Sequence, residues 1–132
     1  GDTVVYLPKE RVIATGDLVV GTFQFMYMGD AFVNEWPDTV EQLLRLEFDT
    51  VVPGHGDPFT DKNRLRQYQA YWRDLWREAQ ALRKQGLTAE EAAKRVDLTA
   101  HKASFPQIQG RGVDVRAMLR MYDVMDGREM PR

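Results

Sequence analysis

The sequence predicts an α/β fold in which a mixed sheet is followed by helices. Short apolar, β-branched runs at residues 4–7, 12–15 and 48–52 are typical of strands. A helical pattern separates the last two runs, and apolar residues recur at spacings of three and four after residue 60. The chain has 132 residues and 43% hydrophobic content, which suits one domain with its own core.

The first forty residues are β-rich. The runs at residues 4–7 and 12–15 flank a polar turn, so we expect a hairpin that ends at Gly16-Asp17. Residues 23–32 are apolar and aromatic without a clean period, which favours packing in the core. Because this segment follows Asp17 so closely, it could also form the wall of a pocket.

Residues 35–47 are predicted to form a helix, since Pro37 suits a first turn and Val40, Leu43 and Leu44 supply a buried stripe. The order strand, helix, strand makes the flanking strands parallel, with their carboxyl ends at the same edge of the sheet. Asp17 and His55 each follow one of those ends. Ligands of open α/β sheets collect at this edge, and an Asp with a His can form part of a metal site there.

His55 stands between two glycines, directly after Pro53 has ended the strand at residues 48–52. The glycines bring the backbone close and leave the imidazole unobstructed. Two ordinary interpretations remain open at this point. His55 could hydrogen-bond within a turn, and Asp17 could be a plain turn residue of a Gly-Asp pair.

Two segments in this order resemble the second half of a metallo-β-lactamase-fold hydrolase. They are Thr15-Gly16-Asp17-Leu18 and, after a helix, Asp49-Thr50-Val51-Val52-Pro53-Gly54-His55-Gly56. The opening GDTVVYLPKERVIATGD is also similar to the strand pair before that family's bridging aspartate. The resemblance implies half of an αββα sandwich, with residues 1–60 as the β-rich half-sandwich carrying the metal-ligand loops and residues 61–132 as a helical region packed on it.

The resemblance also implies a function. It makes Asp17 the ligand that bridges two zinc ions and His55 a ligand of one of them, in metal-assisted hydrolysis of an ester, thioester, lactone, lactam or related bond. The family's His-x-His-x-Asp-His motif and its next ligand histidine lie upstream of the region that aligns with Gly1. This chain contains only His55 and His101, so we expect it to be inactive alone.

The implied partner is the missing N-terminal half or a second copy of this chain. We expect such a partner to cover an apolar sheet face that includes Val5, Ile13, Val51 and residues 23–32. The competing hypothesis is a non-catalytic half-domain that binds another protein or itself. In the parent enzyme, the substrate would be a small molecule.

Composition excludes some classes of function. A net charge of −2 gives no pull toward nucleic acid or an anionic membrane, and the absence of cysteine excludes thiolate sites. No apolar run approaches the roughly 20 residues of a membrane span, and no signal peptide is visible.

The remaining sequence predicts three helices. We expect a long one from Asp61 to Gln85, capped by Thr60 and stopped by Gly86, and a short one that begins with the capping box at Thr88. The last helix is expected over residues 113–125, with an inward face that carries Val115, Met118, Leu119 and Tyr122. His101 lacks a partner motif and is interpreted as a surface or helix-end residue.

Overall fold

The computed structural model describes residues 3–20, 31–106, 108, 110 and 113–128. Within these parts of the chain, one mixed sheet has the strand order β1 (Val5–Leu7), β2 (Val12–Val20), β3 (Thr50–His55). β1 pairs antiparallel with β2, and β2 pairs parallel with β3 after helix α1 (Trp36–Leu44). The predicted α/β class, the hairpin and the parallel crossover are therefore confirmed.

Both strands at the candidate site run further than the sequence predicts. β2 continues through Gly16 and Asp17, and β3 continues through Pro53 to His55. A proline is tolerated in β3 because it is the last strand in the sheet order, where the missing N–H is not needed by a further strand. Asp17 thus lies within β2, and His55 is the last residue of β3, so neither is in the loop after its strand.

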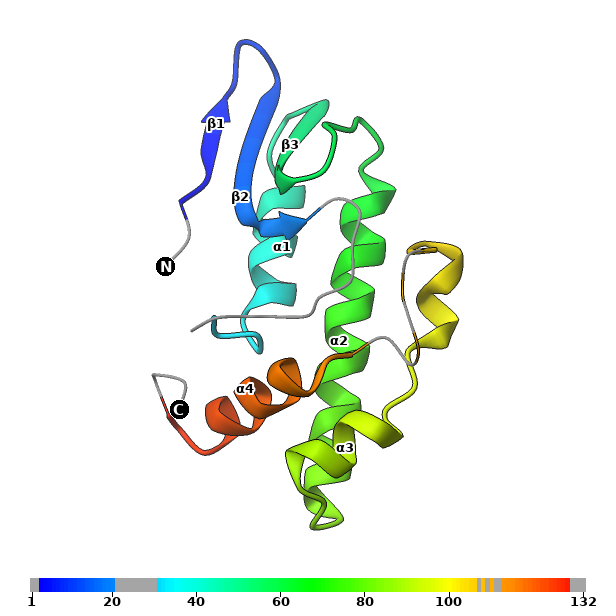
Figure 1. Cartoon of the computed structure of the whole chain (residues 1–132). Coiled ribbons are helices and arrows are strands. Elements are labelled where there is room, and N and C mark those ends of the chain that lie inside the picture. The colour runs from blue at the N-terminus through cyan, green and yellow to red at the C-terminus, as the bar shows by residue number, and fades with distance from the viewer. Residues whose placement is uncertain (1–2, 21–30, 107, 109, 111–112, 129–132) are drawn as a thin grey trace.

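Helix α2 (Asn63–Lys84) is the longest element, with 22 residues or about 33 Å. One end of it lies near the sheet and α1, and the other contacts α3 (Ala89–Arg95) and α4 (Val115–Met125) (Figure 1). A 3₁₀ helix, η1 (Thr99–Ala103), follows α3 and was not predicted. Among the helices described, none has the length and apolar content to cross a membrane.

The helix ends test the capping predictions. The box at Thr88 is confirmed, since its side chain accepts from the Glu91 N–H and the Glu91 carboxylate accepts from the Thr88 N–H. Thr60 as a cap is wrong, because α2 begins only after Lys62 and it is Asp61 that accepts from a backbone N–H, that of Asn63.

The core centres on Trp72 of α2, which is fully buried. Its ring meets those of Trp36, Tyr68 and Tyr71 edge to face, at centroid distances of 4.4, 6.0 and 5.6 Å. Tyr68 and Tyr71 are also buried, so this face of α2 packs in the core. The same cluster joins sheet residues such as Ile13 to the helices.

The inward face of α4 was predicted incorrectly in part. Val115 and Leu119 are 37% and 42% exposed, whereas Met118 and Tyr122 are buried as expected. The buried face includes Arg120, whose Nε donates to the Ala31 carbonyl at 3.0 Å. Arg120 is therefore a charged residue in the core. The pattern of apolar residues in α4 could not predict this position.

Helices α1 and α2 lie on one side of the sheet, and none of the other helices described covers the opposite side (Figure 1). Ile13 and Val51 are buried against the helices, so their predicted place on an uncovered face is wrong. Successive strand residues point to opposite faces. The open face instead carries Val5, Leu7 and Val52, which are 51%, 45% and 36% exposed. The predicted contribution of residues 23–30 lies outside the described residues.

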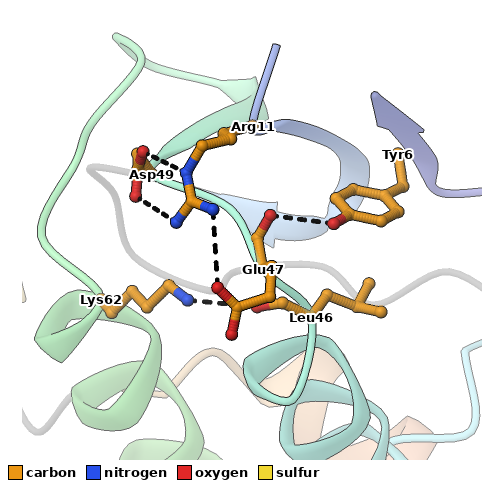
Figure 2. A network of polar contacts seen from close by, with 6 residues as sticks. All are labelled: Tyr6, Arg11, Leu46, Glu47, Asp49 and Lys62. Carbon is orange, nitrogen blue, oxygen red and sulfur yellow. Dashed lines mark hydrogen bonds and ion pairs between the residues drawn. The ribbon is translucent and has the colours of Figure 1, made fainter. Parts of the chain in front are cut away.

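An exposed polar network joins the starts of β2 and β3 (Figure 2). The guanidinium of Arg11 donates twice to the Asp49 carboxylate, at 2.5 and 2.9 Å, and holds the pKa of Asp49 below its usual value. The Arg11 carbonyl accepts from the N–H groups of Asp49 and Thr50. Tyr6 donates to the Glu47 carbonyl at 2.8 Å. These contacts fix the pairing of the two parallel strands at the end away from Asp17 and His55.

Candidate metal-binding edge of the sheet

The carboxyl ends of β2 and β3 bring together the two residues that the sequence analysis singled out. Nε2 of His55 lies 3.3 Å from Oδ1 of Asp17. Both side chains are open to solvent, with 58% of His55 and 71% of Asp17 exposed. The predicted proximity is confirmed, and the assignment of these residues as metal ligands stays a prediction.

A bulge in β2 produces this contact. Gly16 pairs with Pro53 and Val20 pairs with His55, so residues 17–19 of β2 lie opposite Gly54 alone. Gly16 has a φ of +53°, a left-handed conformation that favours glycine. The extra residues turn the backbone at Asp17 and direct its carboxylate toward β3, as bulges beside active sites commonly do.

Gly54 allows the close approach of the two strands. A Cβ at this position would lie 2.5 Å from the carbonyl carbon of Gly16 and 2.7 Å from the backbone nitrogen of Asp17, and it would also meet Oδ1 of Asp17. Any other residue would force these backbone atoms apart. The two glycines that flank His55 are visible in the sequence. Only the structure shows that Asp17 occupies the space that a side chain at Gly54 would need.

The geometry of the pair fits a shared metal ion. Nitrogen and oxygen ligands at about 2.0–2.2 Å from a tetrahedral zinc lie about 3.3–3.5 Å from each other. The observed distance of 3.3 Å between Nε2 and Oδ1 matches that separation. A contact between side chains this exposed contributes only about 0–1 kcal/mol to stability even when both are charged.

Two ligands do not complete a catalytic site, which uses three protein ligands and a water. In the described parts of the chain, no group of three or more His, Cys, Asp or Glu side chains is placed to hold one metal ion. His55 and Asp17 are therefore one part of a possible site.

His101 lies in the last turn of η1, so the helix-end alternative of its prediction is confirmed and the surface alternative is wrong. Its side chain is only 13% exposed, and Nε2 lies 2.9 Å from Oδ2 of Asp74. Its ring packs edge to face on Tyr71, with the centroids 5.5 Å apart. Asp74 also pairs with Arg77 at 2.9 Å. This second His–Asp pair ties η1 to α2 and lies among packed helices, not at the sheet edge.

Comparison with known proteins places the chain among related sequences. A metallo-beta-lactamase type 2 of Bacillus cereus is 38% identical over 58 residues, which cover 41% of this chain and 23% of that protein. A linear primary-alkylsulfatase of a Pseudomonas species is 26% identical over 115 residues, or 79% of this chain and 21% of that protein. The chain thus spans about a fifth to a quarter of the length of these relatives. No family model matches it.

Solved structures extend the likeness across the helices. The stereoselective inverting sec-alkylsulfatase Pisa1 from a Pseudomonas species superposes with a TM-score of 0.64 at 21% identity, covering 92% of this chain and 21% of that one. A double mutant of the same sulfatase gives 0.66 at 16% identity over the same shares. Over this part of their length, the chain is related to the metallo-β-lactamase-fold superfamily of hydrolases and has the corresponding α/β fold.

Proposed function

We propose that this chain forms part of a zinc-dependent hydrolase in which His55 and Asp17 are metal ligands. The single observation that carries the proposal is the 3.3 Å contact between His55 Nε2 and Asp17 Oδ1 at the edge of parallel strands. His55 would bind through Nε2. Asp17, with two carboxylate oxygens, is suited to reach a second ion. When bound, zinc would supply an activated water and polarise the scissile bond.

We further propose that the substrate is a sulfate ester. The match to the alkylsulfatase covers 79% of this chain, and the match to the B. cereus lactamase covers 41%. The longer match therefore includes helical residues beyond the metal loops. A sulfate ester suits a metal site because its oxygens are anionic and can bind the cation directly.

A metal titration tests the role of the two ligands. The chain is expected to bind one cobalt(II) or zinc(II) ion with a dissociation constant weaker than about 1 μM, because two donors stand in place of three or four. His55→Ala and Asp17→Ala should each remove the cobalt absorption bands. His101→Gln is the matched control and should leave them unchanged. Equal binding by wild type and His55→Ala would contradict the assignment.

The open sheet face supports a second part of the proposal, that this face binds the N-terminal half of such a hydrolase or a second copy of the chain. Strand register aligns Val5, Ala14 and Val52 in one row across the sheet. Leu7 and Val12 pair in the adjacent row. Apolar rows of this kind are typical of a sheet that packs against another sheet.

Association of the isolated chain tests this face. At micromolar concentration we expect a dimer or larger assembly by light scattering, because the apolar rows would otherwise stay in water. The double variant Val5→Lys/Val52→Lys should be monomeric. Leu119→Lys changes an exposed apolar residue of α4 and should leave the assembly intact. A monomeric wild-type chain would count against self-association through the sheet.

A further inference from the structure

We infer that Tyr68 of α2 is a positioning residue for Asp17. This inference rests on the proposed function, since it concerns how one proposed metal ligand is held. The hydroxyl of Tyr68 donates a buried hydrogen bond of 2.7 Å to the carbonyl of Leu18, the residue directly after Asp17. The two residues are 50 positions apart in the sequence, so this bond connects the long helix to the bulge.

The bulge gives this bond its importance. Between the Gly16–Pro53 and Val20–His55 pairs, the parallel ladder has no register partner for Leu18. A buried carbonyl outside the ladder needs a donor from elsewhere, and leaving it without one is costly. Tyr68 supplies that donor. The bond therefore fixes the Leu18–Val19 peptide group. That group is next to Asp17, whose carboxylate faces His55.

The position of Tyr68 is itself well determined. Its side chain is 1% exposed, and its ring packs edge to face on Trp72 at 6.0 Å. The next residue, Gln69, donates to the Pro37 carbonyl at 2.7 Å and so ties α2 to α1. Leu18 and Val19 are both buried. Two constraints thus act on Asp17, the Gly54 contact from β3 and the Tyr68 bond from the helix layer.

Tyr68→Phe removes the hydroxyl and keeps the ring, so it separates positioning from packing. In metal-free protein, the NMR resonances of the His55 ring at fixed pH report the nearby Asp17 carboxylate. Asp17→Asn should shift them, and Tyr68→Phe should shift them part of the way in the same direction. Metal affinity should fall by about three- to tenfold in Tyr68→Phe, the effect of losing one buried hydrogen bond.

Tyr122→Phe is the matched control. Tyr122 is also buried, and in the described part of the chain its hydroxyl has no hydrogen-bond partner. This variant should leave both the His55 resonances and the metal affinity unchanged. If Tyr68→Phe unfolds, 3-fluorotyrosine at position 68 keeps the ring and strengthens the donor, and the His55 resonances should then shift in the opposite direction from those of Asp17→Asn.

The two measurements, the His55 resonances and the metal affinity, separate this inference from the proposed function. If the wild-type chain binds no metal, the proposed function fails, but the resonances still test whether Tyr68 sets the Asp17–His55 contact. If wild type binds metal and Tyr68→Phe matches it in affinity and in His55 resonances, the positioning role is overturned. A loss of stability in Tyr68→Phe with unchanged His55 resonances would also overturn it, because the bond would then only stabilise the core.

Discussion

The isolated 132-residue chain is expected to hydrolyse neither sulfate ester nor lactam reporters, with or without added zinc. Two protein ligands cannot close a catalytic zinc site, and the described residues include no group of three or more His, Cys, Asp or Glu side chains placed to hold one metal ion. Addition of a separately expressed N-terminal half that carries the family's His-x-His-x-Asp-His motif should restore hydrolysis. The sulfate ester should then be the better substrate.

In the restored assembly, His55→Ala and Asp17→Ala should each lower hydrolysis by more than about 100-fold, since loss of a direct ligand exceeds the cost of losing an outer-shell partner. His101→Gln and Asp38→Ala are controls of the same residue types and should retain activity. Turnover by the isolated chain that is insensitive to His55→Ala would show that the chemistry lies elsewhere. Faster hydrolysis of the lactam would contradict the proposed substrate class.

Gly54→Ala is expected to weaken metal binding by the chain while leaving most of the fold in place. The added Cβ would meet the Gly16 and Asp17 backbone at 2.5 and 2.7 Å, so β2 must move and carry the Asp17 carboxylate away from His55. Overpacking of this kind costs about 1–3 kcal/mol of stability. We expect metal affinity to fall at least about tenfold, as measured by competition with a chromophoric chelator.

Gly86→Ala provides the control for Gly54→Ala. Gly86 has a φ of +81° and open space around its Cα, so alanine there strains the backbone without touching the site. Its unfolding free energy should fall by about 1 kcal/mol with no change in metal affinity. If Gly54→Ala lost stability and kept its metal affinity, the glycine would serve packing only.

Local pattern and topology together predicted the framework of this site. Two β-branched strands with a helix between them imply a parallel pair, and that pairing places Asp17 and His55 toward one edge of the sheet. The bulge that brings them into contact was not predicted. The strand ends were less predictable. Pro53 was expected to break β3, but an edge strand has no need of its N–H.

Contacts between residues far apart in the sequence could not be predicted. His101 and Asp74 are 27 positions apart, and neither lies in a motif that suggests the other. The Tyr68–Leu18 bond and the core position of Arg120 have the same origin, because each depends on how a helix packs and not on a local pattern. Val5 and Ile13 were assigned to one face, but Val5 pairs with Ala14, the neighbour of Ile13, and successive strand residues point to opposite faces.

Location of a bound metal tests the central claim most directly. Crystals of the chain grown with zinc should show an anomalous scattering peak, at the zinc edge, within about 2.0–2.2 Å of both His55 Nε2 and Asp17 Oδ1. That result would establish the pair as joint ligands. A zinc peak at the His101–Asp74 pair, with His55 and Asp17 still in direct contact, would contradict the account.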